Sequence, residues 1–348
     1  MLRLSFLRRR PITPARASSP PVSDPAAPTR STENRPAGST STLAPSATVH
    51  IDLDGAQDIF EGRGWGYASA DDPVFETGMR HALDFFAASG VKATLFVIAR
   101  SLRDKRKRAL IDEAARAGHE LASHTLNHRY LTQLDTKGKR EEIRGSRELM
   151  EQELGVPVLG FRAPGYRIDR ESIELLAECG YAWDSSVFPT AKYATALGMP
   201  VETLRAPHTP IPGSDFVEWP MPDHRPFPLP FNPSYSLLLG DWLFRGGVRR
   251  FRAGGLPLSL LFHLIDFSEP LAADRLRGLA SKVFTLSTLG ADEKRARCHS
   301  MLRLVRDNYR IMTTYEAIAE WRGAQPESRV AASGGQGGGH KETRSGTA

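Results

Sequence analysis

The sequence predicts a single α/β domain, arranged as a distorted barrel of seven parallel strands, (β/α)7, with disordered ends. Three observations lead to this fold class. Short apolar or β-branched runs alternate with longer helical patterns through residues 46–324. Four of the helical patterns are followed directly by glycine. Five of the strand-type runs deliver an ionisable side chain at or just after their carboxyl end, as the strands of an enzymatic βα barrel do.

The strands are expected from runs that are rich in apolar and β-branched residues and are bounded by polar ones. In chain order they are Ala47–Ile51, Ala93–Ile98, Glu120–Ser123, Val158–Arg162, Tyr181–Ser185, Ser259–His263 and Ile311–Thr314. Strands that are separated by helices imply parallel pairing, because each helix carries the chain back to the same end of the sheet.

The helices are expected where apolar residues recur with a helical period. They are Phe75–Ser89, Lys105–Ala117, Lys139–Leu154, Arg170–Cys179, Asp292–Asn308 and Tyr315–Trp321. The first four are followed by Gly90, Gly118, Gly155 and Gly180. Glycine at this position ends a helix easily, because it adopts the left-handed conformation without a steric penalty.

Three segments do not follow the alternation. Residues 1–45 are rich in Pro, Ser, Thr and Arg, and residues 325–348 are rich in Gly, so we expect a disordered leader and a disordered tail. Residues 187–258 form a long insertion with many prolines, which we expect at the barrel rim, where such excursions cap or shape a site. Its aromatic residues include Trp219, Phe227, Phe231, Tyr235 and Trp242.

Most of the net charge of +6 lies outside the barrel. The leader alone carries seven arginines against Asp24 and Glu33, so the body of the chain is close to neutral. A nucleic-acid-binding face needs clustered Lys and Arg, and we therefore expect no nucleic-acid partner.

Cysteine usage and hydropathy say little about the compartment. Cys179 and Cys298 are the only cysteines, so no disulfide framework is expected. No apolar run has the length of a membrane span. The leader places its arginines after a short apolar stretch, the reverse of a secretory signal, although its composition is also that of an organellar transit peptide. We expect a cytoplasmic protein.

Ionisable side chains gather at the carboxyl ends of five predicted strands. Asp52 and Asp54 follow the first strand, and His124 and His128 follow the third, four residues apart. These ends meet at one rim of a parallel barrel, where active sites of such barrels lie. Two carboxylates and two histidines can supply three metal ligands and a spare base, the set of a hydrolytic metal centre. The fourth, fifth and sixth strands end with Arg162, Asp184 and His263.

In this order and spacing, the motifs resemble those of the NodB-homology polysaccharide deacetylases, the carbohydrate esterase family 4 type. That family's second motif, His-Ser/Thr-x-x-His, is matched by residues 124–128. Its third, Arg-x-Pro-x-Tyr/Phe, is matched by residues 162–166, and its fifth, Leu-x-x-His, by residues 260–263. The resemblance covers about residues 46–322. It implies a metal-dependent de-N-acylase on a distorted βα barrel.

Two motifs depart from the common family pattern. The first motif is commonly Thr-Phe-Asp-Asp-Gly, whereas Asp52 and Asp54 stand here in an Asp-x-Asp form. This form is similar to that of the branch with cyclic-ureide amidohydrolases and atypical peptidoglycan deacetylases. In the fourth motif, Trp183 precedes Asp184 instead of following it. The substrate therefore stays open between an N-acetylated glycan or oligosaccharide, a formylated or acetylated lipid-linked or nucleotide-linked sugar, and a small cyclic ureide.

The residue types suggest a division of labour. Asp54, His124 and His128 are the expected ligands of one divalent metal ion, with zinc the expected ion, and the histidines would share one face if their segment were helical. Asp52, beside the metal but not needed as a ligand, is the expected general base.

The resemblance implies the remaining roles. Arg162 pairs with the general base, and Asp184 steadies this arginine. The backbone N–H of Tyr166 stabilises the oxyanion together with the metal. His263 protonates the leaving amine as general acid.

The expected activity is hydrolysis of a carbon–nitrogen bond that removes an N-acyl group, most simply N-acetyl, from an amino sugar in a glycan or glycan precursor. A rival is a haloacid-dehalogenase-like phosphatase with Asp52 as nucleophile. That class expects Thr or Val after Gly55, where Ala56 stands, and leaves the histidines unexplained. A second rival is a non-catalytic carbohydrate-binding relative on the same barrel.

Overall fold

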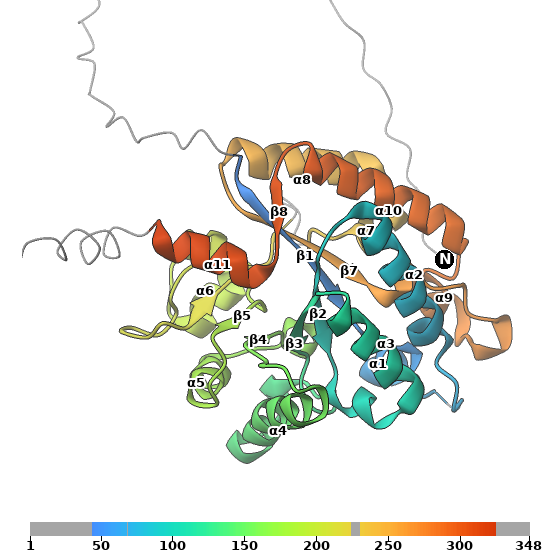
Figure 1. Ribbon diagram of the computed structural model, residues 1–348, viewed down its shortest axis with the longest axis horizontal. Helices are drawn as coiled ribbons and strands as arrows, with labels where there is room; N and C mark the ends of the chain where they lie inside the picture. The colour runs from blue at the N-terminus through green and yellow to red at the C-terminus, as the bar shows by residue number, and fades with distance from the viewer. Residues whose placement is uncertain (1–43, 68, 224–229, 325–348) are drawn as a thin grey trace, which may run out of the picture. The chain divides into compact units, whose positions relative to one another are not determined.

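The computed structural model describes residues 44–67, 69–223 and 230–324 (Figure 1). The predicted tail, Phe227 and all but the last two residues of the predicted leader lie outside the described residues. None of the helices in the described part is both long and apolar enough to cross a bilayer.

The core of the fold is one sheet, in which every strand pairing is parallel. Its spatial order is β6-β5-β4-β3-β2-β1-β7, and β8 pairs with β1 outside this path. The strands are β1 (Ser46–Asp52), β2 (Thr94–Val97), β3 (Glu120–Ser123), β4 (Gly160–Phe161), β5 (Trp183–Asp184), β6 (Val217–Glu218), β7 (Leu258–His263) and β8 (Arg310–Met312). All seven predicted strands are present, although β4 and β5 are shorter than predicted.

Strand β1 organises the sheet. One of its edges pairs with β7 from Ala47 to Asp52. Its other edge is shared, because β8 pairs with its first half and β2 with its second half. No pairing joins β6 to β7 within the described residues, so the sheet curls without closing. This open (β/α)7 arrangement confirms the predicted distorted barrel.

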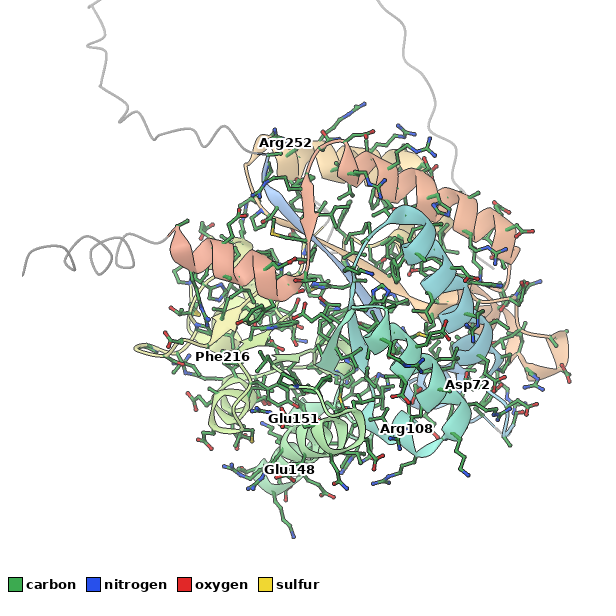
Figure 2. The ribbon with its side chains drawn as sticks, viewed as in Figure 1. Asp72, Arg108, Glu148, Glu151, Phe216 and Arg252 are labelled. Atoms are coloured by element: carbon green, nitrogen blue, oxygen red, sulfur yellow. The ribbon has the colours of Figure 1, made fainter. Side chains whose placement is uncertain are left out.

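Helices surround the strands (Figure 1), with α11 against β1, α7 against β7, α4 against β3 and α5 against β5. Their bounds are α1 (Ala56–Gly62), α2 (Pro73–Ser89), α3 (Lys105–Arg116), α4 (Thr136–Leu154), α5 (Arg170–Glu178), α6 (Ala191–Leu197), α7 (Pro233–Leu239), α8 (Asp241–Ala253), α9 (Gly278–Phe284), α10 (Ala291–Arg306) and α11 (Thr314–Gly323). All six predicted helices are present. Charged side chains such as Glu148 of α4 lie at the periphery (Figure 2).

Local sequence explains where the best-predicted helices begin and end. The carboxylates of Asp72, Asp104, Asp135 and Asp169 accept backbone N–H groups in the first turns of α2, α3, α4 and α5. Gly90 and Gly155 end α2 and α4 with φ values of 62° and 65°. These caps fix the helix ends, and with them the lengths of the loops at the strand ends.

The predicted rim insertion, residues 187–258, is largely structured. It contains β6 and the helices α6, α7 and α8. The sequence alone does not indicate these elements, because β6 has only two residues and prolines and glycines interrupt the helical periodicity. Its Trp219 and Phe231 are fully buried, so they belong to the core rather than to an exposed sugar-binding surface.

Candidate metal centre

Asp54, His124 and His128 converge at the carboxyl end of the sheet. The Nε2 atoms of His124 and His128 each lie 3.4 Å from Oδ1 of Asp54. Potential ligand atoms of the three residues all lie within 4.8 Å of one another. Two nitrogens and one oxygen at this spacing can hold one cation and leave positions for water and substrate.

The two histidines reach this point through a loop, not through the helix considered above. Thr125 and His128 have φ values of 68° and 62°, a left-handed conformation that is uncommon for residues with a side chain. The loop is held there by its own contacts. The His128 N–H donates to Oγ1 of Thr125 at 3.0 Å, and the Ala99 N–H donates to the Thr125 carbonyl at 3.0 Å. Such locally strained backbone is typical of functional sites.

Two buried atoms at this point lack a partner. Oδ1 of Asp54 and Nε2 of His128 have no hydrogen bond within the described residues. Nδ1 of His124 lies 2.8 Å from the Arg162 carbonyl, which can only accept, so Nδ1 carries the proton and Nε2 is left with its lone pair. Orphaned buried polar atoms are costly. A divalent cation would satisfy all three groups, so the residues fit a metal ion.

The electrostatics of the centre favour a positive charge. Burial acts to raise the pKa of Asp54, but the imidazoles of His128 and His124 outweigh it and hold the pKa below its usual range. Burial acts to lower the pKa of His124, but the carboxylates of Asp52 and Asp54 outweigh it and raise the pKa. A site that stabilises both a carboxylate and an imidazolium is suited to binding a cation in place of the protons.

Asp52 lies beside this centre in a different setting. It is the last residue of β1 and is 3% exposed. Its Oδ1 accepts a hydrogen bond from a terminal nitrogen of Arg162 at 2.8 Å. Its Oδ2 lies 3.9 Å from Nε2 of His263, which stands opposite it in the β1–β7 register. Arg162 therefore fixes one carboxylate oxygen and leaves the other on the side of His263.

Arg162 is fully buried and satisfied on every side. Its Nε donates to the Ser185 carbonyl at 2.8 Å, and its second terminal nitrogen donates to Oγ of Ser185 at 2.9 Å and to Nδ1 of His50 at 2.7 Å. Its Cζ lies 3.8 Å from the centre of the Phe96 ring. Because a buried, unpaired arginine is strongly destabilising, these contacts are what allow the charge to stand next to Asp52.

His50 connects this arginine to the opposite end of the barrel. Arginine can only donate, so Nδ1 of His50 accepts, and Nε2 carries the proton and donates to Oγ1 of Thr314 at 2.9 Å. The Thr314 hydroxyl lies 2.7 Å from that of Thr94, which donates to Glu120 at 2.7 Å. Burial, followed by the charge of Arg162, lowers the pKa of His50, which keeps the imidazole neutral as this chain requires.

Asp184 acts on Arg162 without a direct contact. No ion pair or hydrogen bond joins their side chains within the described residues, although, against the effect of burial, which raises the pKa of Asp184, the charge of Arg162 acts to lower it. Instead, Oδ1 of Asp184 accepts from the Ser186 hydroxyl at 2.7 Å, and this hydroxyl in turn accepts from the Ala163 N–H at 2.8 Å. Asp184 thus fixes the backbone next to Arg162, while Ser185 contacts the guanidinium itself.

A second carboxyl group lies next to Asp184. Glu218 of β6 stands opposite Asp184 of β5 in the register, and both side chains are fully buried. Oε1 of Glu218 accepts the N–H groups of Ser186 and Val187 at 3.2 and 3.0 Å. Burial raises the pKa of Asp184 to about 6, and burial together with the Asp184 carboxylate raises the pKa of Glu218. Two buried carboxyls so placed favour sharing one proton.

His263 is oriented by groups that the sequence does not single out. Its Nδ1 lies 3.2 Å from Oγ of Ser234, and this hydroxyl donates to Oδ1 of Asp266 at 2.7 Å. Oδ2 of Asp266 accepts the His263 N–H at 2.9 Å. Because the Ser234 proton is used, Nδ1 of His263 carries a proton, and Nε2 is the atom presented to Asp52. The one sequence signal for the role of Asp266 is its position three residues after His263.

Tyr166 also lies at the site, in a left-handed conformation with φ 57°. Its backbone N–H donates to the Ala163 carbonyl at 2.9 Å, so the predicted oxyanion donor is already engaged in a turn. Its side-chain hydroxyl is buried and has no hydrogen-bond partner within the described residues. Burial, followed by the Asp52 carboxylate, raises the pKa of this hydroxyl well above its ordinary value. The hydroxyl, rather than the N–H, is the free donor of Tyr166.

Comparison with known sequences agrees with this site. A family model described as polysaccharide deacetylase matches residues 67–183, a stretch that includes His124, His128 and Arg162. A peptidoglycan deacetylase-like protein of Gibberella zeae is 34% identical over 98 residues, which are 28% of this chain and 28% of that protein. A peptidoglycan-N-acetylglucosamine deacetylase of Bacillus cereus is 29% identical over 111 residues, 32% of this chain and 51% of that protein. The chain thus aligns with about half or less of these curated relatives.

Solved structures show the same fold. A structure named as a polysaccharide deacetylase of Mycobacterium smegmatis has a TM-score of 0.53 at 20% identity, covering 80% of this chain and 90% of that one. A Puue allantoinase has a TM-score of 0.53 at 15% identity, covering 81% of this chain and 91% of that one. Over residues 67–183 the sequence thus matches the polysaccharide deacetylase family, as its motifs predict, and the described residues share the fold of solved structures.

Proposed function

We infer that this protein is a metal-dependent hydrolase that removes an N-acyl group, most simply N-acetyl, from an amino sugar in a glycan or glycan precursor. The observation that carries the proposal is the pairing of two distinct carboxylates at one rim. Oδ1 of Asp54, which has no hydrogen bond within the described residues, lies between His124 and His128. Asp52 is bound by the buried Arg162, and its Oδ2 lies 3.9 Å from Nε2 of His263. Both family and site chemistry point to amide hydrolysis.

Asp54, His124 and His128 would hold the metal, and zinc suits a set of two nitrogens and one oxygen. When bound, such an ion polarises a carbonyl group and lowers the pKa of water. Asp52 is suited to be the general base, because Arg162 occupies its Oδ1 and its Oδ2 is free to accept a proton. Arg162 also fixes the orientation of this carboxylate beside the site.

His263 is suited to deliver a proton to the leaving amine. Ser234 and Asp266 orient its ring through Nδ1, and its Nε2 points to the side of Asp52. An imidazolium held between Asp52 and the Ser234–Asp266 pair can donate from Nε2 without a large movement. The side-chain hydroxyl of Tyr166 is a further donor for the developing oxyanion, since it has no other partner.

Metal analysis joined to a substrate panel tests the proposal. Purified protein should contain about one zinc-like ion per chain, and release of acetate from N-acetylated sugars should stop on chelation and return when metal is restored. The panel should also contain formylated sugars, a small cyclic ureide such as allantoin, and a phosphate monoester. A metal-free preparation with full activity, or metal-loaded protein that releases acid from none of the N-acyl substrates, contradicts the proposal.

The phosphatase alternative has less support. It requires Asp52 as an open nucleophile, whereas Arg162 binds one oxygen of this carboxylate and the site places two histidines beside Asp54. Rapid release of phosphate with magnesium, unaffected by His124→Ala, would favour it. Binding of metal and sugar without any hydrolysis would favour a non-catalytic carbohydrate-binding protein.

A further inference from the structure

A cavity of about 570 Å³ opens beside the metal centre. One of the candidate ligands, His128, forms part of its wall, so a molecule bound there has one end at the metal centre. The volume is typical of small-molecule sites. Most of the wall is polar, and its residues come from the end of α1, the loop after β3 and the segment after residues 164–166: Glu61, Gly62, Asn127, His128, Arg129, Tyr130, Gln133, Leu134 and Arg167.

Two arginines of this wall have no carboxylate partner. Arg129 and Arg167 are exposed, and neither forms an ion pair with any of the described residues. The acidic groups nearby are otherwise engaged. Glu61 binds Arg100 at 3.0 Å and Gln57 at 2.7 Å, and Glu142 binds the backbone and side-chain nitrogens of Asn127. Arg129 and Arg167 outnumber Glu61, the one carboxylate of the cavity wall, so the wall carries a net positive charge.

One of these arginines is held in a defined place. The guanidinium carbon of Arg167 lies 4.1 Å from the centre of the Tyr130 ring. That ring is itself fixed, because its hydroxyl donates to the Gly62 carbonyl at 3.0 Å. Stacking on an aromatic face leaves the edge of a guanidinium free to bind an anion in a bidentate manner, and it reduces the entropy lost on binding. The arrangement is that of a prepared anion site.

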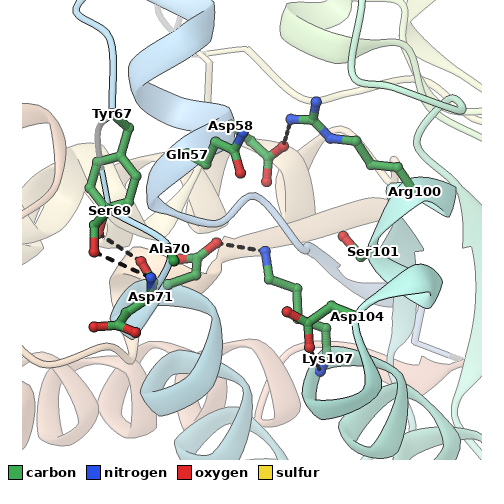
Figure 3. Close-up of a pocket in the computed structure, with 11 residues that line it drawn as sticks. Gln57, Asp58, Tyr67, Ser69, Ala70, Asp71, Arg100, Ser101, Asp104 and Lys107 are labelled. Carbon is green, nitrogen blue, oxygen red and sulfur yellow. Dashed lines mark hydrogen bonds and ion pairs between the residues drawn. The ribbon is translucent and has the colours of Figure 1, made fainter.

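A neighbouring cavity shows what a structural charge cluster looks like in the same molecule. The cavity of about 180 Å³ in Figure 3 also contains basic side chains, those of Arg100 and Lys107. Here each base meets a buried carboxylate, Arg100 with Asp58 at 2.5 Å and Lys107 with Asp72 at 2.7 Å. Both bases of this cavity thus have a carboxylate partner. Arg129 and Arg167 have none among the described residues.

We propose that the cavity beside His128 binds an anionic group of the substrate, a carboxylate or a phosphate, through Arg167 and Arg129. This rests on the proposed function, and it narrows the substrate class to N-acyl sugars that also bear negative charge near the acyl group. A carboxylate would come from an acidic residue of a glycan, and a phosphate from a nucleotide-linked or lipid-linked sugar. The anion sets the register of the sugar, and the acyl group lies at the metal centre.

The test compares a neutral substrate with two that carry negative charge from different sources. Release of acetate is followed from an N-acetylated oligosaccharide with glucuronate residues, from the same oligosaccharide with its carboxylates methyl-esterified, and from UDP-N-acetylglucosamine. We expect kcat/KM for one acidic substrate to exceed that of the esterified one by about tenfold or more, mainly through KM, since hydrogen bonds to charged groups contribute this much. The preferred acid identifies the source of the anion. Added salt should reduce the preference.

Matched variants assign the effect to the cavity. Arg167→Gln and Arg129→Gln should each reduce the ratio of kcat/KM between acidic and esterified substrates by about threefold to tenfold. Arg116→Gln, an equally exposed arginine at the end of α3 away from this cavity, should leave the ratio as it is. A ratio close to one in the native protein, or one that does not respond to Arg167→Gln and Arg129→Gln, overturns the proposal.

A binding measurement keeps this inference separate from the proposed activity. Calorimetric titration of the metal-loaded protein with the glucuronate oligosaccharide should show binding that weakens in Arg167→Gln and with esterification. If that pattern appears without acetate release, the anion site stands and the proposed deacylation fails. If acetate is released but neither charge nor Arg167→Gln affects binding, the deacylation stands and the anion site fails.

Discussion

The two carboxylates of the site, Asp52 and Asp54, are two residues apart, yet they lie in opposite surroundings. Asp52 ends a strand and is held by a buried arginine that is itself fixed by Ser185 and His50. Asp54 follows in a loop, and its orphaned oxygen faces two imidazoles on strained backbone. The comparison indicates that the neighbouring side chains decide whether a carboxylate is suited to act as a base or as a metal ligand.

The largest expected effect comes from removing Asp54, the carboxylate that we assign to the metal. Asp54→Ala should lower the metal content from about one ion per chain to almost none and turnover by about a thousandfold or more, because metal catalysis contributes several kcal/mol. Metal is measured by elemental analysis and turnover by acetate release. The control Asp84→Ala changes an exposed aspartate of α2 and should change neither. A variant Asp54→Ala that retains metal would remove the distinction between the two carboxylates.

The next effect comes from the other member of the pair. Asp52→Asn keeps the shape and a hydrogen-bond acceptor for Arg162 but removes the base. Turnover should fall by about a hundredfold or more, as for the loss of a general base, while metal content stays the same. Thermal unfolding should accompany the assay, because Arg162 loses its counter-charge and the fold will lose stability. Full activity of Asp52→Asn would falsify the role assigned to it.

The sequence predicts the surroundings of the two carboxylates to different extents. The strand ends that bring Asp52, Asp54, Arg162 and His263 to one rim were predictable, because periodicity and helix-ending glycines mark each βα unit. The ligand loop was not, because the left-handed backbone of Thr125 and His128 depends on contacts with residues 99 and 100 of another loop. The spacing of the two histidines indicated only that they would share a face if their segment were helical.

The partners of Arg162 show the same limit. His50, Ser185 and Glu218 reach the site through the parallel sheet order, which sequence periodicity does not specify. His50 stands two residues before Asp52 in β1 and so points to the same face, which is the one local signal that could have indicated it. The family resemblance implied that Asp184 steadies Arg162, but it is the next residue, Ser185, that contacts the guanidinium directly. A shift of one residue reverses the face of a strand.

The third prediction concerns the hydrogen-bond chain that positions Arg162, the partner of Asp52. Thr314→Val keeps the shape of the side chain but breaks the hydrogen-bond chain from Arg162 through His50 to Glu120. We expect turnover to fall by roughly threefold to tenfold with unchanged metal content and KM, because one hydrogen bond is worth about 1 kcal/mol. Thr314→Ser retains the hydroxyl and should restore most of the loss. Equal behaviour of Thr314→Val and Thr314→Ser would show that the chain stabilises the fold without positioning Arg162.

The smallest expected effect concerns a second carboxyl pair, Asp184 and Glu218, which supports the Arg162 side without touching the metal. Burial raises the pKa of Asp184 to about 6 and, together with Asp184, raises that of Glu218. Because both pKa values are raised on folding, the folded protein holds its shared proton more tightly than the unfolded chain does. The stabilisation is therefore fully present below about pH 4 and is lost as pH rises through 6 and above.

Glu218→Gln removes the contribution of Glu218 to this dependence, because an amide can donate to Asp184 at every pH and has no proton to lose. Between pH 5 and pH 8, the free energy of unfolding of the native protein should fall relative to that of Glu218→Gln by on the order of 1 to 3 kcal/mol. Urea unfolding of the two proteins at both pH values measures this difference, and the comparison cancels the titration of all other groups. Parallel stability profiles would mean that the pair shares no proton. The carboxylates near Arg162 would then keep the same charge across this pH range, as Asp54 does beside its two imidazoles.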